Sequence, residues 1–507
     1  MSTSDYQELP GTQAPHDSSV VVDKSVSLTL GSDSLVIIAP SSLLAVYNPL
    51  DVTVRCTGSN RVSRAESKSN TTHAISLYNV LDAEVTPSEL VITYAVPSSK
   101  NDVVVTALRY PVPVKERPAV EAWAQTLLNV AYGNAQQRKR LKVLVNPFGG
   151  KGTAASLYQK YAAPIFAAAR CHVDVQNTEH RGHAIEIAKN LDINLYDAIV
   201  TCSGDGLPYE VFNGLGERPN AREALAKIAL APLPCGSGNG ITWNCLGTGS
   251  VSVAALAIVK GLRTPLDLIS VTQKGTRTLS FLSQSFGIVA DCDLGTDNIR
   301  WMGAARFTYG FLVRLLSSTI YPCSLSIKTE IGDKKAIKEH YAKFASREFD
   351  PALDAPRIAA AQQSPALPDL KYGTVSDDLP TDWEIVPGEN IGNFYAGNMA
   401  IMTKDTNFFP ASLPNDGLMD IVTIDGNIGR ATSLKMMNEV STGGFFGLPD
   451  VYIRKATAFR LVPHEKEGYI SIDGESVPFE AFQCEIHQGL GTVLTKSGVI
   501  YEAEGPK

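Results

Sequence analysis

The sequence lacks an excess of basic residues, closely spaced cysteine pairs and long apolar runs. Its 507 residues carry a formal net charge of −7, so the basic stripe typical of nucleic-acid binding is not expected. The eight cysteines are scattered, and none of them forms a Cys-x-x-Cys pair. This pattern argues against a disulfide framework or a zinc site, and it predicts reduced thiols in a cytoplasmic protein.

Signals for secretion or membrane insertion are also missing. No run approaches the roughly 18–20 apolar residues that cross a bilayer. Residues 1–19 contain neither a basic start nor an apolar stretch, so we expect no secretory signal there. The sequence has no polybasic cluster either, and any membrane contact is expected to be peripheral.

The composition that remains is that of an ordinary folded chain, with 44% hydrophobic and 19% charged residues. This length predicts two or three domains. The polar residues 1–24 predict a disordered tail. Residues 25–135 contain short β-branched runs and then a helical pattern near 119–131, which predicts a small β-rich domain similar to a pleckstrin-homology (PH) fold.

The next segment, 136–264, alternates strand and helix patterns and predicts an α/β domain with mainly parallel strands. Strands are expected at 141–145, 171–177, 197–202 and 228–232, and helices at 151–170, 182–190, 206–215, 239–247 and 251–260. Short alternating strands dominate 265–507 and predict an antiparallel β-sandwich. An amphipathic helix is expected there at 302–316. The Pro-, Ala- and Asp-rich residues 348–382 lack periodicity and predict a disordered insertion.

Three glycine-rich turns are the most informative motifs. They read NPFGGKG from Asn146, SGDG from Ser203 and PCGSGN from Pro234. The first two directly follow apolar, β-branched runs, as turns at strand ends do. Glycine lets backbone N–H groups approach a ligand closely, and a helix that starts just after the turn adds a positive dipole end. The turns therefore predict a phosphate site, although the pattern is not a Walker A loop.

The middle turn also carries a carboxylate, Asp205, which a pure phosphate cradle would avoid. We interpret it as a base beside a phosphate site; the alternative is a plain turn aspartate. His180 and His183 lie three residues apart, but no cysteine or acidic cluster completes a metal-ligand set, so a structural role is favoured. Asp416 and Asp420 are more typical of a turn and a strand edge than of an ion site.

The order of these motifs resembles the diacylglycerol-kinase catalytic superfamily and, within it, the sphingosine (long-chain base) kinases. The further matching segments are TEHRGHA from Thr178, LPNDGLMDIV from Leu413 and SIDGE from Ser471. The segment SFGIVADCDLGTDNIRWMGAARFTYG, from Ser285 to Gly310, is the strongest signal for the sphingosine type. The resemblance extends from about residue 140 to the C-terminus.

The resemblance implies a role for each matched position. Asp205 would be the general base towards the primary hydroxyl of a lipid, and Asp293 would bind the 3-hydroxyl and 2-amino group of a sphingoid base. Positions implied to contact the nucleotide are Asn146, Gly149, Gly150, Gly152, Thr178, Ser203, Gly204, Gly206, Glu210, Ser237, Arg300, Arg306, Asp473 and Glu475. Arg300 and Arg306 would pair with phosphates, while Asp473 and Glu475 would close the site from the C-terminal domain.

The activity implied is the ATP- and Mg²⁺-dependent phosphorylation of a sphingoid base at a peripheral membrane surface, without nucleic acid; a homodimer is left open. A ceramide or diacylglycerol kinase is one alternative, although the Asp293 carboxylate favours a free amine. A non-catalytic lipid-binding protein with a kinase-like fold is the other, and the intact motifs argue against it. The pattern departs from the family at Pro208-Tyr209, at Gly240 to Trp243 and at Gly295-Thr296, which leaves chain-length and base preference open.

Overall fold

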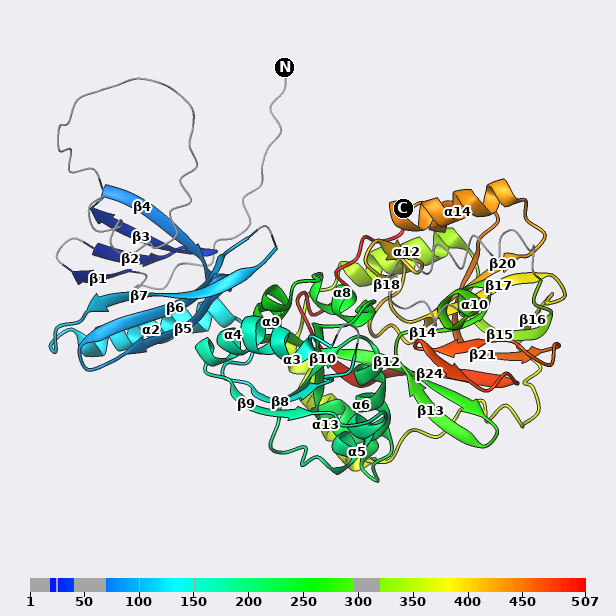
Figure 1. Ribbon diagram of the computed structural model, residues 1–507. Helices are drawn as coiled ribbons and strands as arrows, with labels where there is room; N and C mark the ends of the chain where they lie inside the picture. Colours follow the sequence, from blue (N-terminus) through cyan, green and yellow to red (C-terminus); the bar gives the residue numbers. More distant parts are fainter. Residues whose placement is uncertain (1–18, 24–25, 41–69, 100, 150–151, 296–319) are drawn as a thin grey trace, which may run out of the picture. The chain divides into compact units, whose positions relative to one another are not determined.

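The computed structural model describes residues 19–23, 26–40, 70–99, 101–149, 152–295 and 320–507 (Figure 1). By its internal contacts the chain divides into two compact units. The first comprises Met1–Ser98 with Val103–Gly133, and the second comprises Ser99–Asp102 with Asn134–Lys507.

The described residues of the N-terminal unit form two antiparallel sheets followed by the helix α2, which confirms the predicted β-rich domain; the likeness to a PH fold stays a prediction. One sheet contains β1 (Ser19–Asp23), β2 (Val26–Leu30), β3 (Ser34–Pro40) and β4 (Asn70–Ser76); the other contains β5 (Val80–Val85), β6 (Glu89–Pro97) and β7 (Val103–Pro111). Helix α2 (Arg117–Tyr132) buries Val120, Trp123 and Leu127. The predicted tail is wrong at residues 19–23, because β1 pairs with β2 there; residues 1–18 lie outside the described part.

The α/β part of the second unit has four parallel strands in the order β9-β8-β10-β11. These are β8 (Arg140–Val145), β9 (His172–Asn177), β10 (Ala198–Ser203) and β11 (Ala229–Pro234), all close to the predicted bounds. The helices are α5 (His183–Asn190), α6 (Gly206–Gly216), α7 (Ala221–Lys227), α8 (Gly240–Leu246) and α9 (Val251–Val259). Of these, only α7 was not predicted. The carboxyl ends of the parallel strands carry the three glycine turns at one edge of the sheet.

The long helix predicted at 151–170 is divided into three short pieces. They are α3 (Ala154–Leu157), the π-helical turn η2 (Tyr158–Ala162) and α4 (Ala163–Ala168). Pro164 explains the break, because proline has no N–H for the helix ladder and its ring clashes with the carbonyl of the preceding turn. The π-turn accommodates this defect just upstream.

The rest of the second unit is a predominantly antiparallel β-sandwich, as predicted (Figure 1). Its strands are β12 (Leu262–Gln273), β13 (Thr276–Ser280), β14 (Ser283–Gly287), β15 (Cys323–Ile331), β16 (Glu384–Val386), β17 (Ile391–Gly397), β18 (Ile401–Thr403), β19 (Thr406–Asn407), β20 (Met419–Asp425), β21 (Tyr452–Pro463), β22 (Ile470–Ile472), β23 (Glu475–Val477) and β24 (Phe482–Thr495). Its helices are α10 (Ile288–Leu294), α12 (Lys334–Ala345), α13 (Asp354–Gln363) and α14 (Arg430–Thr442). Phe286, Phe394 and Phe459 lie at the centre of its buried apolar core.

Strands β12 and β24 join the two halves into one continuous sheet. Along β24, residues up to His487 pair with the sandwich part of β12, and residues from Gly491 pair with its first residues. Val493 of the same strand also pairs in parallel with Leu230 of β11. One 14-residue strand therefore belongs both to the parallel sheet of the α/β part and to the sandwich.

The prediction of a disordered insertion at 348–382 is wrong. This segment contains the short helix η4 (Pro351–Leu353) and helix α13, and the second of these is fastened by Arg357. The guanidinium of Arg357 donates to Thr492 Oγ1 at 2.7 Å and to the carbonyl of Ala226 at 3.1 Å. This segment lacks a periodic pattern, but tertiary hydrogen bonds such as those of Arg357 stabilise its structure. The helix predicted at 302–316 lies outside the described residues.

Within the described part of the chain, no single helix is long and apolar enough to cross a membrane. Helices α8 and α9 satisfy the length and hydropathy criteria only when taken together, and they are bent by 50° relative to each other. Most residues of both helices are buried, which is also the behaviour of core helices.

Candidate active site

The first glycine turn is closed by the side chain of Asn146, which follows β8. Its Oδ1 accepts from the N–H groups of Phe148 at 2.9 Å and Gly149 at 3.0 Å. Gly152 has a φ of +68°, a conformation that favours glycine. The predicted nucleotide residue Gly150 lies outside the described residues, so the structure places Asn146, Gly149 and Gly152 of this turn together.

The second and third turns touch backbone to backbone. A Cβ atom added to Gly236 would lie 2.3 Å from the Cα atom of Gly204, which no side chain tolerates. Asn239, in the left-handed region with a φ of 55°, closes the third turn by accepting from Gly236 N at 2.9 Å. Ser237 is exposed at the tip of this turn, where its hydroxyl is available to a ligand. Glycine at 236 is thus required by its close approach to the backbone of Gly204.

This contact predicts that Gly236→Ala damages both the fold and the site. Overpacking against backbone that cannot move typically lowers the free energy of unfolding by about 1–3 kcal/mol. We also expect nucleotide affinity to fall, because the second and third turns must separate. Denaturant unfolding and calorimetric titration with ATP measure the two effects. Gly429→Ala is the matched control, since a Cβ there meets nothing within 4 Å. Equal effects of the two substitutions would contradict the argument.

Asp205 is the residue that precedes α6, and the N-terminus of α8 holds its carboxylate. Oδ2 accepts from Gly240 N at 2.9 Å, and Oδ1 accepts from Ile241 N at 3.0 Å. Burial raises the pKa of the Asp205 carboxyl above the ordinary aspartate value, and these two N–H groups oppose the rise. Each oxygen keeps a lone pair that can accept another proton. The result is an oriented carboxylate with raised basicity.

The sandwich contributes Glu475 to the same place. Its Oε2 pairs with Arg181, and its Oε1 lies 3.7 Å from where a Cβ of Gly206 would be. Residues 294 positions apart thus meet beside the turn that carries Asp205. Arg181 was not among the predicted site residues. Its signal was available, since it is the cation of the TEHRGHA segment.

Asp473, which was predicted to contact the nucleotide, is buried. Its carboxylate accepts from Ser280 Oγ at 2.6 Å and from the N–H groups of Phe281, Leu282 and Ser283 at 2.9 Å each. Burial raises the pKa of Asp473 to about 6 in spite of these bonds. These four hydrogen bonds all go to the β13–β14 turn, so the carboxylate of Asp473 fixes the conformation of that turn.

Asp293, predicted to bind the lipid headgroup, accepts from Ser471 Oγ at 3.0 Å. It lies on α10, and Ser471 begins the SIDGE motif, so two motifs of the resemblance meet here. Arg300 and Arg306, the predicted phosphate partners, lie outside the described residues.

Two tyrosines lie close to these acids: Tyr209, which the sequence marked only as a departure from the family pattern, and Tyr395. Burial raises the pKa of Tyr395, and the negative charges of Asp293, Asp473 and Asp205 raise it further. Burial, with the charges of Asp473 and Glu475, raises the pKa of Tyr209 to about 12. Asp205, Asp293 and Asp473 therefore lie near Tyr395, and Asp473 and Glu475 lie near Tyr209. Tyr395 stands in an ordinary strand pattern, and no sequence signal marked it.

Three other predicted nucleotide residues hold loops in place. Glu210 accepts from Gly182 N at 3.0 Å and Ala184 N at 3.1 Å, at the start of α5. Thr178 is buried and donates its N–H to Val145 O at 2.8 Å. Ser203 donates its hydroxyl to the carbonyl of Gly204 at 2.6 Å. These contacts fix the edges of the site, while the predicted nucleotide contacts themselves remain predictions.

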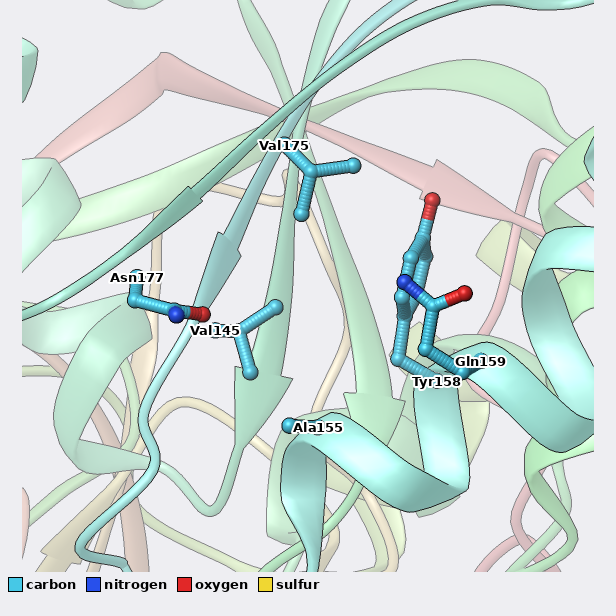
Figure 2. A pocket seen from close by; sticks show the side chains of 6 residues that line it. All are labelled: Val145, Ala155, Tyr158, Gln159, Val175 and Asn177. Atoms are coloured by element: carbon cyan, nitrogen blue, oxygen red, sulfur yellow. The ribbon is translucent and has the colours of Figure 1, made fainter.

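A cavity of about 210 Å³ lies beside the first turn (Figure 2). Figure 2 shows Val145 and Val175 of the sheet on one side and Tyr158 and Gln159 of the π-helical turn on the other. Ala155 and Asn177 complete its lining. The interruption of the helix at η2 therefore borders an open space next to the phosphate turn.

The two histidines and two aspartates for which the sequence favoured structural roles make contacts that fit such roles. The rings of His180 and His183 stack at 4.8 Å, and His183 Nδ1 accepts from Glu179 N at 3.0 Å. Asp416 and Asp420 flank a lysine instead of an ion: the fully buried Lys455 Nζ is 3.2 Å from an oxygen of each. Within the described ranges, no group of three or more His, Cys, Asp or Glu residues could hold a metal ion.

Comparisons with known proteins agree with this geometry. Residues 140–271 match a family model described as the diacylglycerol kinase catalytic domain. Residues 392–494 match the YegS C-terminal NAD kinase beta sandwich-like domain, and residues 18–133 match a domain of unknown function. The parallel sheet with its three turns, followed by the sandwich, thus defines a protein of the diacylglycerol-kinase catalytic class.

Curated relatives narrow the class. The chain is 34% identical to sphingoid long chain base kinase 5 of Saccharomyces cerevisiae over 74% of this chain and 62% of that one. It is 35% identical to sphingoid long chain base kinase 4 of Schizosaccharomyces pombe, over 74% and 79%. It is 30% identical to human sphingosine kinase 1, over 69% and 88%. The chain belongs to the family of sphingoid long-chain base and sphingosine kinases, and it spans less than two thirds of the S. cerevisiae relative.

Proposed function

We propose that this protein transfers the γ-phosphoryl group of ATP to the primary hydroxyl of a sphingoid long-chain base. The observation that carries the proposal is the Asp205 carboxylate, held by two backbone N–H groups between the glycine turns. The names of the relatives support a sphingoid base as the substrate. The three glycine turns support the binding of a nucleotide phosphate. Phosphoryl transfer asks a protein mainly for positioning, a base and charge stabilisation, and this site offers the first two.

In the proposed reaction the lipid hydroxyl donates a hydrogen bond to a free lone pair of Asp205. As the oxygen bonds to phosphorus, its proton passes to this carboxylate, whose raised pKa favours acceptance. The first and third turns hold the phosphates through their N–H groups. Asp293, beside Ser471, would bind the amino group and hydroxyl of the base. Arg300 and Arg306 are proposed phosphate partners on grounds of sequence alone.

Magnesium fits this set of donors. Mg²⁺ in kinases usually takes one or two carboxylates together with substrate phosphates and water, so it needs no larger protein cluster. Glu475 is a carboxylate beside the middle turn and would hold it together with the phosphates. When bound, it would neutralise negative charge on the phosphate oxygens. We also propose that the substrate reaches the site from a membrane surface that the cytoplasmic protein contacts peripherally.

The test is a phosphorylation assay with purified protein, labelled ATP and Mg²⁺. Micelles of sphingosine, dihydrosphingosine, ceramide and diacylglycerol are offered separately. Labelling of the two free bases alone is the expected result, because Asp293 gains most from a cationic amine. Labelling of ceramide or diacylglycerol instead would overturn the assignment of the headgroup. ATP binding without transfer to any lipid would overturn the proposed reaction.

A further inference from the structure

Two cysteines stand directly beneath the catalytic turns, and the proposed reaction uses neither. Cys202 is the residue before Ser203 at the end of β10, and Cys235 follows β11 immediately. The two strands are parallel neighbours, and Cys202 pairs in register with Leu233. Cys235 N donates to the carbonyl of Ser203 at 3.0 Å, so the chain brings the two residues side by side. Both thiols are free.

The thiols also interact with each other. The interaction with Cys202 lowers the pKa of the Cys235 thiol. The pKa of the Cys202 thiol is raised, mainly by burial and in addition by Cys235. Cys202 is fully buried, whereas Cys235 keeps 7% of its surface exposed beside the partly exposed third turn. The pair therefore consists of one slightly exposed thiol with a lowered pKa and one fully buried thiol on the neighbouring strand. Reactive cysteines that form disulfides have this division between an attacking and a resolving thiol.

We propose that Cys202 and Cys235 are a redox-modification site that a hydroperoxide converts into an intramolecular disulfide. The Cys235 thiolate attacks the peroxide O–O bond, which gives a sulfenic acid and releases water or an alcohol. The sulfur of Cys202 then attacks the sulfenic sulfur, its proton leaves with the hydroxyl as water, and the S–S bond forms. One peroxide is reduced by two electrons for each pair of thiols oxidised.

The disulfide would displace the second and third glycine turns, because their backbones are already in contact and cannot move closer. An S–S bond of about 2.05 Å is much shorter than a hydrogen-bonded contact between two sulfur atoms, so the strand ends must move together. The neighbouring glycines already touch, since a Cβ on Gly236 would overlap Gly204. The movement must then be taken up by the third turn and α8, whose N-terminus holds Asp205. Oxidation is expected to misplace the base.

The activity part of this inference rests on the proposed function, but the bond itself is detected independently. The reduced full-length protein is first assayed, then treated with hydrogen peroxide, alkylated and mapped by mass spectrometry without reduction. The expected result is one intramolecular link between the peptides that contain Cys202 and Cys235. Kinase activity should fall by roughly 100-fold, the cost that a displacement of about 1 Å can impose, and dithiothreitol should restore it.

Cysteine variants test whether the loss of activity is caused by the disulfide. Cys235→Ala and Cys202→Ala should each remove the link and the reversible loss of activity, and Cys235→Ser repeats the first test with a polar side chain. Cys245→Ala is the matched control, because Cys245 is also buried and lies near Cys235 in sequence; it should keep both effects. Absence of the link at peroxide levels that oxidise the more exposed Cys171 would overturn the proposal. So would a reversible loss of activity that persists in both alanine variants. A link without loss of activity would overturn its coupling to Asp205.

Discussion

Asp205→Asn is expected to lower kcat for sphingoid-base phosphorylation by about 10²–10⁴-fold, the contribution typical of a positioned general base. The asparagine keeps the size of the side chain but accepts no proton. ATP binding should change little, because the glycine turns supply the phosphate contacts. Single-turnover phosphorylation and ATP titration measure the two quantities separately.

The substitution also exchanges one acceptor oxygen for an NH₂ group that would face an α8 N–H, so some stability is lost. Asp333→Asn is the matched control. Asp333 also accepts from a helix N–H group, that of Ala336 at 2.9 Å, but at the start of α12. An Asp205→Asn enzyme that keeps near-normal turnover while still folded would remove Asp205 from the role of base.

The second large effect is expected at Lys455, in a buried cluster on the neighbouring sandwich strands β20 and β21. Lys455→Met should lower the free energy of unfolding by about 3–5 kcal/mol, the usual cost of removing one partner from a buried ion pair. The methionine fills similar volume but leaves Asp416 and Asp420 without their shared cation, and Asp420 Oδ1 already lacks a hydrogen-bond partner. Urea unfolding followed by circular dichroism measures the loss.

Two further variants make this prediction specific. Lys435→Met removes an exposed lysine from α14 and should change stability little. Adding Asp420→Asn to Lys455→Met removes one of the stranded charges and should recover part of the loss. If Lys455→Met were as stable as the wild type, the cluster would have no net role in folding.

Much of the fold was predictable because local pattern and tertiary environment agree. The runs that became β8, β10 and β11 are continuous and apolar, as strands buried on both faces must be. The glycine turns were recognisable because close backbone approach leaves few residue choices. Prediction failed where local pattern is weak: α12 buries only Ile337 and Phe344, so its polar sequence gives little helical signal.

The candidate site shows a similar division. Asp205 and Asn146 could be placed from their motifs, since their contacts are made within a few residues or to the next turn. The partners of Glu475 and Asp473 could not, because each depends on contacts about 190 or more residues away. The ion pair with Arg181 and the burial of Asp473 follow from how the sandwich meets the sheet. The packing of the sandwich against the parallel sheet depends on many core residues and on no single motif.

The strand that both halves share has a consequence for how the protein is made. β24 is synthesised long after β11, and among the described strands β11 has no neighbour on that side until β24 arrives. An α/β half synthesised up to β12 therefore exposes an open, apolar sheet edge, the kind of surface on which chains aggregate. The three glycine turns therefore gain their final support only after β24 has been synthesised.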